Sequence, residues 1–226
     1  MSDSYDSDKE DNSDLDYLDE MPEVAYVHEP QNRIKSGEEI NITEKDPTIS
    51  EILIGVGWDL KKFDSKKLDL DASMFLLGID DKTRVDDDFI FYNNMIGCDG
   101  AVKHQGDSRT GAGDGDDEVM TIKLNELPFD VAKIAFALSI YDPDFEGYDF
   151  SMVKNVYFRL VSNAIDHEIF RFELDDELTG KGEGLLIGGL ERLGSEWIFK
   201  AVGETVKDGL GEIADNYGII ILENMQ

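Results

Sequence analysis

The sequence predicts an all-β fold, a β-sandwich of about ten short strands with one or two short helices. From Ile40 onward, short runs rich in β-branched and aromatic residues follow one another, and turn signals such as Asp80-Asp81 and Asp99-Gly100 separate them. Few windows show helical periodicity, and no repeat of about 20 to 50 residues is visible. Many short strands without helices between them are typical of a sandwich.

The predicted strands share a length of four to nine residues and a high content of apolar side chains. They are Glu51–Trp58, Ala72–Ile79, Phe89–Asn93, Val119–Leu124, Lys133–Tyr141, Val156–Val161, Glu168–Leu174, Leu185–Glu191, Trp197–Val202 and Ile219–Leu222. Met120, Ile122 and Leu124 alternate with polar residues, which indicates a strand with one wet face. By contrast, Ile134–Ile140 is apolar on both faces apart from Ser139, which predicts a central strand covered on both sides.

Two segments favour short helices instead of strands. One lies near Asp149–Asn155 and the other near Lys207–Tyr217. Gly209 and Gly211 weaken the second segment, because glycine costs about 1 kcal/mol relative to alanine inside a helix.

The amino-acid composition limits the classes of partner that this chain can bind. Its 226 residues carry a formal charge of −30, with 51 acidic and 21 basic side chains. This charge argues against nucleic acid and anionic membrane surfaces as partners, and it favours cations and basic proteins. Cys98 is a single cysteine and has no partner for an internal disulfide.

The chain divides by composition into an acidic tail and a globular domain. Met1–Pro30 holds eleven acids and one lysine, so we expect residues 1–33 to form a disordered tail and residues 34–226 to form the sandwich domain. The start has neither the basic nor the apolar region of a secretory signal, and no apolar run is long enough to span a membrane. We therefore expect a cytoplasmic protein without direct membrane insertion.

Gly106–Glu118 is the stretch most suited to a cation. Its sequence, GDSRTGAGDGDDE, combines four glycines with five acids. Glycine lets the backbone fold tightly while carboxylates converge, and converging carboxylates repel one another unless a cation neutralises them. The acids of this loop are Asp107, Asp114, Asp116, Asp117 and Glu118.

Further acids are expected to join this loop. Asp69 and Asp71 are two residues apart, so on an extended strand both carboxylates point the same way. Asp142 closes the predicted central strand and is a third contribution. Such oxygen-rich sets suit Ca²⁺, whereas three histidines and one cysteine show no zinc spacing.

An alternative is that these acids form only a soluble turn of a very acidic protein. The loop is not an EF-hand, because Arg109, Gly111 and Ala112 stand where that motif requires acid, acid and glycine. The acidic run Asp80–Asp88, which contains Lys82 and Arg84, fits a solvated hairpin tip better than a metal site.

Five segments together resemble the TerD family of tellurium-resistance and stress-response proteins. The resemblance covers roughly Ile34–Leu222 and leaves out the acidic tail. The segments are GVGWD (Gly55–Asp59), LDLDASMFLLG (Leu68–Gly78), DFIFYNN (Asp88–Asn94), DGAVKHQGDSRTGAGDGDDE (Asp99–Glu118) and EWIFKAVG (Glu196–Gly203).

The resemblance implies a cytoplasmic, Ca²⁺-binding β-sandwich without demonstrated catalytic activity, from operons that confer tolerance to tellurite, phage or chemical stress. It carries over six positions as ligands or their neighbours: Asp69, Asp71, Asp107, Asp116, Asp117 and Glu118. The chain departs from the family pattern at Tyr141, where histidine is usual, at Gly97-Cys98, where Ser-Pro is usual, and at Ser108, where asparagine is common.

We therefore expect a non-catalytic, calcium-binding interaction module whose partners are other proteins of a tellurium-resistance or stress complex. Attachment of such a complex to a membrane through another subunit stays open. The alternatives are a metal-dependent enzyme or a cyclic-nucleotide-binding protein that uses the same loops. His104 precedes Asp107 by three residues, but no nucleophile elbow or phosphate loop accompanies it, and Arg109 is the single arginine in the loop.

Overall fold

The computed structural model describes residues 32–60, 68–107, 115–141, 149–165, 167–174 and 182–220. The chain divides into two units, Met1–Gln31 and Asn32–Gln226, and every described residue belongs to the second unit. The predicted acidic tail therefore lies outside the described residues, apart from Asn32 and Arg33.

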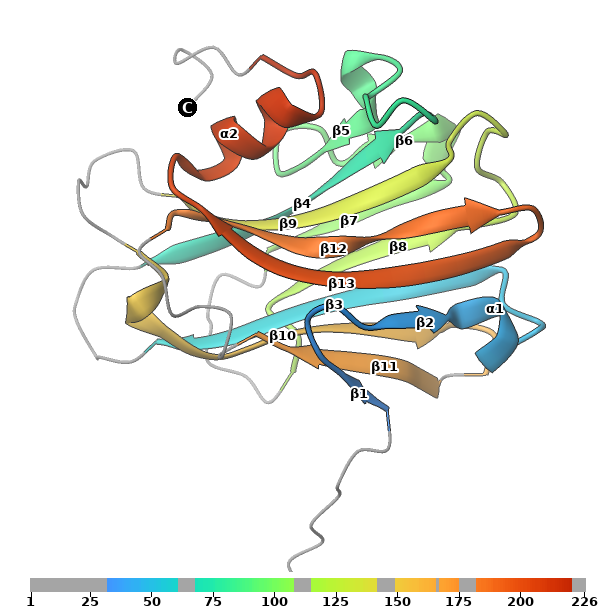
Figure 1. The fold of residues 1–226 in the computed structure, drawn as a ribbon, viewed down its shortest axis with the longest axis horizontal. Helices are drawn as coiled ribbons and strands as arrows, with labels where there is room; N and C mark the ends of the chain where they lie inside the picture. The colour runs from blue at the N-terminus through green and yellow to red at the C-terminus, as the bar shows by residue number, and fades with distance from the viewer. Residues whose placement is uncertain are drawn as a thin grey trace, which may run out of the picture. The chain divides into compact units, whose positions relative to one another are not determined.

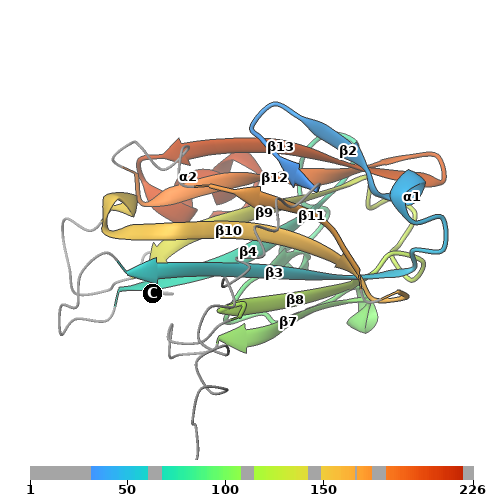
Figure 2. The ribbon, with the colours of Figure 1, turned by 90° about the horizontal axis from the view of Figure 1, so that it is seen from below.

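A seven-stranded sheet, sheet A, forms one layer of a β-sandwich (Figures 1 and 2). In spatial order its strands are β1 (Arg33–Ile34), β11 (His167–Glu173), β10 (Val153–Ser162), β3 (Glu51–Leu60), β8 (Glu118–Lys123), β7 (Val102–Asp107) and β6 (Ile96–Gly97). Neighbouring strands are antiparallel except for the short parallel pair β1 and β11.

A six-stranded antiparallel sheet, sheet B, forms the other layer. In spatial order its strands are β2 (Glu39–Asn41), β13 (Glu196–Val206), β12 (Gly184–Leu193), β9 (Lys133–Tyr141), β4 (Asp69–Leu77) and β5 (Phe89–Ile90). Strand β5 pairs with β4 only at Met74 and Phe75, so the first half of β4 is an edge of the sheet.

Short helices connect or cover the strands. Helix α1 (Ile42–Lys45) lies between β2 and β3, and the Asn41 side chain caps it by accepting the Glu44 amide. Helix α2 (Gly209–Asn216) follows β13, and 3-10 turns occur at Asp86–Asp88, Cys98–Gly100 and Phe150–Met152. Within the described ranges, no helix has both the length and the apolar composition to cross a membrane.

The main core lies between the two sheets. Ile54 from sheet A and Met74 from sheet B are fully buried there. Phe136 and Phe158 meet across the core with ring centroids 5.1 Å apart, and Phe158 stacks on Phe199 at 5.4 Å. These aromatic contacts hold the sheets together because each ring buries a large apolar surface.

A second, smaller core lies on the outer face of sheet B, where α2 packs (Figure 1). Phe75 of β4 and Ala137 of β9 are buried there with Ile213 of α2. The prediction that β9 is a central strand covered on both sides is confirmed, since its other face contributes Ile134 and Phe136 to the main core.

The predicted fold class is confirmed, and so is the helix near Lys207–Tyr217, which is α2. One local prediction was wrong, and another was correct only in part. Ile219 and Ile220 form no strand, because Ile219 instead bonds back to Ala214 at the end of α2 and packs in the small core. The segment near Asp149–Asn155 forms only a 3-10 turn before β10 begins at Val153.

Asp46, directly after α1, ties this connection to β10. Its carboxylate accepts hydrogen bonds from the Ser162 hydroxyl at 2.6 Å and from the Thr48 hydroxyl at 2.6 Å and amide at 2.9 Å. These bonds, the one from Ser162 foremost, hold the pKa of Asp46 below its usual value. Asp46 therefore stabilises the fold above its unfolded pKa, about 3.9, and this stabilisation is lost as the pH falls through the lower folded pKa.

We expect Asp46→Asn to lower the free energy of unfolding at pH 7 and to have a smaller effect at pH 3. Denaturant unfolding of both proteins across this pH range measures the difference. The control is Asp87→Asn, since Asp87 is exposed, and this protein should follow the wild type. A gap between Asp46→Asn and wild type that is constant with pH would contradict the role of the ionised carboxylate.

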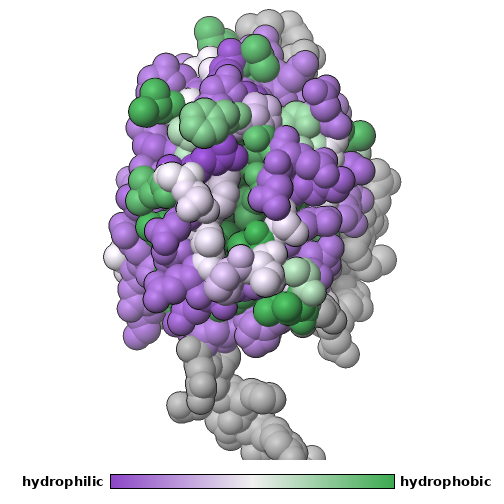
Figure 3. Space-filling view, turned by 90° about the vertical axis from the view of Figure 1, so that its right-hand side faces the viewer, coloured by the Kyte–Doolittle hydropathy of each residue, from purple (hydrophilic) through white to green (hydrophobic). Residues whose placement is uncertain are grey.

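The two ends of the sandwich differ in character. At one end β3 finishes, β4 begins at Asp69 and β8 begins at Glu118; this is called the acidic end. The opposite end, seen in Figure 3, shows apolar side chains between polar ones, and the exposed residues Ile79, Phe129 and Leu193 belong to its turns. Every predicted metal ligand that the structure describes belongs to the acidic end, whereas the acidic run Asp80–Asp88 follows β4 at the opposite end.

Candidate metal centre

Three consecutive acids at the start of β8 point in three directions. Asp116 reaches the outer face of sheet A, Asp117 turns back to β3, and Glu118 points between the sheets to β4. Successive side chains of an extended chain face opposite sides, so neighbouring acids separate unless the backbone turns. The sequence predicted that these carboxylates converge, whereas each of them is held by a different strand.

Glu118 joins the two sheets. Its carboxylate accepts the backbone N–H of Ala72 in β4 at 2.6 Å, and its side chain is 1% exposed. Ala72 lies in the part of β4 that β5 does not cover. Glu118 thus satisfies an amide at an open sheet edge, which would otherwise be buried without a partner.

His104 of β7 supports the same position. Its Nδ1 accepts the Gly106 N–H at 3.1 Å, so in the neutral ring Nε2 carries the proton and donates to the Ala72 carbonyl at 3.1 Å. Nε2 also lies 3.4 Å from the Glu118 carboxylate. Burial is the largest influence on the pKa of His104 and lowers it, but the Glu118 carboxylate, the Ala72 carbonyl and Asp71 together raise it more, and the net direction is upward.

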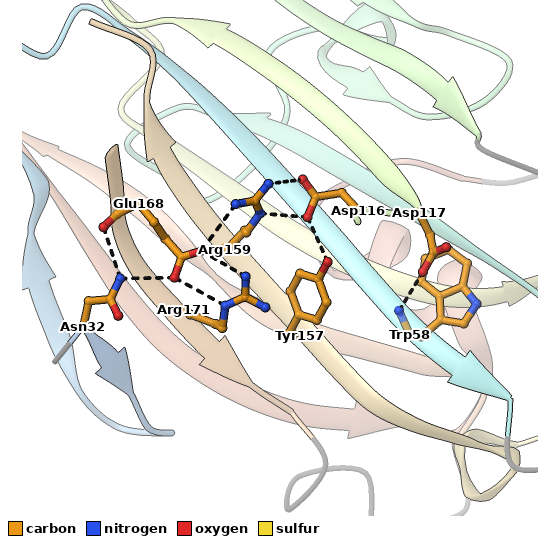
Figure 4. Close-up of polar contacts among 8 residues, drawn as sticks. All are labelled: Asn32, Trp58, Asp116, Asp117, Tyr157, Arg159, Glu168 and Arg171. Atoms are coloured by element: carbon orange, nitrogen blue, oxygen red, sulfur yellow. Dashed lines mark hydrogen bonds and ion pairs between the residues drawn. The ribbon is translucent and has the colours of Figure 1, made fainter. Parts of the chain in front are cut away.

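Asp117 fixes the entrance of β8 to the end of β3. Its carboxylate accepts the Trp58 N–H at 2.8 Å, and its own N–H donates to the Val56 carbonyl at 2.8 Å. Asp117 is 6% exposed. Both its backbone and its side chain are therefore held by two residues of β3, and Figure 4 shows the contact with Trp58.

Asp116 lies against Arg159 of β10 (Figure 4). The two carboxylate oxygens accept Nε and a terminal N–H of Arg159, each at 2.8 Å, and the Tyr157 hydroxyl donates to the same carboxylate at 3.0 Å. The hydrogen bonds to Asp116 raise the pKa of Arg159. Burial, and then the Asp116 carboxylate, raise the pKa of Tyr157 to about 12.

The ion pair continues across the outer face of sheet A. Glu168 of β11 accepts Arg171 at 3.0 Å and Arg159 at 3.4 Å, and it is bonded by the Asn32 amide at 3.1 Å. The Arg171 guanidinium lies 4.2 Å from the centre of the Tyr157 ring. Opposite charges alternate along this row, so neither arginine carries an uncompensated charge.

A cavity of about 550 Å³ opens beside this row. Its lining combines aromatic, acidic and basic side chains. Among the described residues it is lined by Trp58, Asp59, Gly115, Asp117, Asn155, Val156, Tyr157, Arg159, Arg171 and Glu173. Tyr157 and Arg159 were not predicted as site residues from the sequence; the available signal was their spacing of two on a strand, opposite the Gly-Val-Gly segment Gly55–Gly57.

Asp69 and Asp71 were predicted at the entrance of a strand starting at Ala72; β4 begins earlier, at Asp69, so both acids belong to it, and both are half-buried. Ser73 follows on the same face of the strand. Its hydroxyl is fully buried and, within the described part of the chain, is the single buried side-chain oxygen or nitrogen without a hydrogen-bond partner. Asp71 is close enough to His104 to raise its pKa, so β4 brings this acid toward the Glu118 pair.

The structure brings some predicted ligands together and leaves others undecided. Asp71, Asp117 and Glu118 lie around the entrance of β8 and the open edge of β4. Asp107 pairs with Glu118 through the backbone, but its side chain lies outside the description, and Asp142 lies outside the described residues. Among described side chains, no three of histidine, cysteine, aspartate or glutamate are grouped as metal ligands.

Carboxylate and hydroxyl oxygens are the donors that a hard cation such as Ca²⁺ takes. The carboxylates at this end therefore fit calcium by their chemistry. The assignment of calcium ligands stays a prediction.

Fold and sequence define a β-sandwich of the class found in tellurium-resistance proteins. The TerD domain family matches residues 31–217, and the chain belongs to the TerD family. A crystal structure of a homologue of the telluride resistance protein TerD from Streptomyces coelicolor A3(2) superposes with a TM-score of 0.60 at 18% identity. The match covers 74% of this chain and 95% of that chain, and it shows the shared fold.

Two relatives match a similar length of the chain. The chain is 40% identical over 186 residues to tellurium resistance protein TerD from Serratia marcescens, a match of 82% of this chain and 96% of the relative. It is 36% identical over 187 residues to general stress protein 16U from Bacillus subtilis, again with 82% and 96% coverage. The family resemblance predicted from the five sequence segments is confirmed.

Proposed function

We propose that this chain is a calcium-binding, non-catalytic interaction module of a cytoplasmic stress-response system. Its membership of the TerD family, with relatives named for tellurium resistance and general stress, supports the stress-response role. The observation that carries the calcium proposal is that the buried carboxylates of Asp117 and Glu118, consecutive at the entrance of β8, are each oriented by a backbone N–H of another strand, with Asp71 of β4 close enough to act on the neighbouring His104.

The calcium ligands would come from carboxylates that the fold already orients. Asp117 and Glu118 each accept a backbone N–H from a neighbouring strand. A carboxylate has about four acceptor sites, so one such bond orients the group and still permits a cation contact. Asp69, Asp71, Asp107 and Asp142 would complete an oxygen-rich set, and the bound ion would neutralise mutually repelling charges.

The geometry around His104 supports binding and not catalysis. A general base needs a ring nitrogen that can reach a substrate proton. Both nitrogens of His104 instead contact backbone groups, of Gly106 and Ala72, and the residue is 4% exposed.

The alternative of a cyclic-nucleotide site finds little support in the cavity. Arg159 and Arg171 line it, but they are paired with Asp116 and Glu168. A phosphate would have to compete with these carboxylates in a chain of net charge −30.

Calcium is expected to raise the thermal stability of the full-length chain. A ligand that binds only the folded state adds about 1.4 kcal/mol at ten times its Kd. Melting the protein in millimolar Ca²⁺, in millimolar Mg²⁺ and in excess EDTA measures this effect. Equal melting temperatures in Ca²⁺ and EDTA would refute the proposal, and equal shifts with both ions would indicate nonspecific charge neutralisation.

Asp117→Asn and Asp71→Asn should each weaken calcium affinity at least about tenfold, since each removes a charged ligand. Asparagine at 117 keeps an oxygen that can accept the Trp58 N–H, so the local fold is preserved. The matched control is Asp87→Asn, an exposed acid of the Asp80–Asp88 run, which should leave affinity within about twofold. Calorimetric titration gives the three values, and equal losses at all positions would favour diffuse electrostatics.

The interaction role is tested by affinity capture from stressed cells with Ca²⁺ and with EDTA. Ordering of the loop by calcium would present a fixed surface, so we expect specific partners to be lost in EDTA and with Asp117→Asn. Recovery of the same partners under every condition would contradict a calcium-dependent surface.

A further inference from the structure

We propose that Asp116 is the structural anchor of the acidic loop and not one of its calcium ligands, and that Arg159 is the positioning residue that holds it. This inference rests on the proposed calcium function and assigns a different role to one of the predicted ligands. It also explains why three neighbouring acids contact three different strands.

The ion pair between Asp116 and Arg159 holds the carboxylate in one direction. Both oxygens of Asp116 are engaged by Arg159 in a two-pronged arrangement at 2.8 Å, and Tyr157 adds a third hydrogen bond at 3.0 Å. The Asp116 side chain is 6% exposed and that of Arg159 is 29% exposed. A planar guanidinium bound to both oxygens fixes the direction of a carboxylate more firmly than a point charge does.

Two glycines of β3 leave space for Asp116 and for Tyr157. Gly55 lies beneath the Asp116 carboxylate, and a methyl group at this position would overlap it. Gly57 lies beneath the Tyr157 ring, where an added Cβ would be 2.5 Å from ring atoms. The Gly55 and Gly57 positions thus form a recess in sheet A that receives Asp116 and the residue that bonds it.

Fixing Asp116 also restricts the two acids that follow it, Asp117 and Glu118. Asp116 is fixed to β10, the Asp117 amide and carboxylate to β3, and Glu118 to β4. Because these residues are consecutive, fixing Asp116 limits the directions in which the next two carboxylates can point. Residues that orient the ligands of a metal typically change its affinity about 10 to 100-fold when they are replaced.

The direction in which Arg159→Gln changes the calcium affinity distinguishes an anchor from a ligand. If Asp116 were a ligand, Arg159→Gln would free its carboxylate and remove a nearby positive charge, and calcium would bind more tightly. If Asp116 is an anchor, the same substitution releases the loop end and calcium binds more weakly. Arg171→Gln removes the same charge from the same row without touching Asp116, so it is the matched control.

The experiment is a calorimetric calcium titration of the full-length chain and its variants. We expect Arg159→Gln and Asp116→Asn each to weaken binding about tenfold or more, and the double variant to be no weaker than either. Arg159→Lys keeps the charge but not the two-pronged contact, and it should also weaken binding. Arg171→Gln should change affinity by about twofold or less.

Tighter or unchanged binding in Arg159→Gln, with wild-type protein that binds calcium, overturns the inference. Hydrogen exchange at the Asp117 amide in calcium-free protein is a second measurement, since this amide donates to Val56 directly beside the anchor. Exchange should rise about tenfold in Arg159→Gln and not in Arg171→Gln, and unchanged exchange refutes the anchor. If wild-type protein binds no calcium, the proposed function fails, and the exchange result alone decides whether Asp116 anchors the loop.

Discussion

Replacement of Glu118 by alanine is expected to lower the free energy of unfolding by about 3 kcal/mol, even in calcium-free buffer. The loss has two sources: the Ala72 N–H is left without its charged acceptor, and the removed atoms leave a cavity between the sheets. His104 also loses the carboxylate beside its Nε2. Denaturant unfolding in EDTA measures the effect without any contribution from metal binding.

Glu118→Gln is the matched variant, because an amide oxygen can still accept the Ala72 N–H. We expect it to recover a large part of the stability that alanine loses. In calcium, however, Glu118→Gln should still bind more weakly than wild type, since it lacks the charge. A loss below about 1 kcal/mol in Glu118→Ala would show that the contact between the sheets contributes little.

The strands with regular alternation or full burial were predictable from the sequence. Lys133–Tyr141 was predicted with the bounds that β9 has, since its apolar residues on both faces leave no other arrangement in a sandwich. Strand β7, by contrast, was missed. Val102–Asp107 contains Lys103, His104 and Gln105, so its pattern has no apolar side, and its place is set by pairing with β8.

The candidate site was predictable in composition but not in arrangement. The acids of Gly106–Glu118 pointed to one shared centre, because closeness along the chain suggests closeness in space. The partners that direct them come from far away in sequence: Ala72 is 46 residues from Glu118, Arg159 is 43 from Asp116 and Trp58 is 59 from Asp117. The pairing of β3 with both β8 and β10, and the facing of β4 across the sandwich, bring these partners together.

The role of the glycines in the Gly-Val-Gly segment Gly55–Gly57 could not be predicted from the sequence either. It contributed to the family resemblance as a string of letters, with no stated reason for its glycines. The structure supplies the reason, since Gly55 and Gly57 make room for Asp116 and Tyr157 from two other segments. A glycine that permits close approach can be recognised in a sequence only once the approaching group is known.

The recess at Gly55 is expected to be important for stability, because only glycine leaves room for the Asp116 carboxylate there. Gly55→Ala should lower the free energy of unfolding by about 3 kcal/mol, the lower end of the cost of breaking a buried ion pair, because Arg159 is partly exposed. The added methyl group takes the place of the Asp116 carboxylate, which must leave both Arg159 and Tyr157. Denaturant unfolding of the calcium-free protein measures the loss.

Gly115→Ala is the matched control, since it lies next to Asp116 in sequence and an added Cβ there meets nothing within 4 Å. It should change stability by less than about 0.5 kcal/mol, as for a surface substitution. Arg159→Gln combined with Gly55→Ala should cost little more than Gly55→Ala alone, because the methyl group has already broken the same contact. If the two substitutions add in full, Gly55 acts through something other than the Asp116 ion pair, and its role as the floor of that recess is refuted.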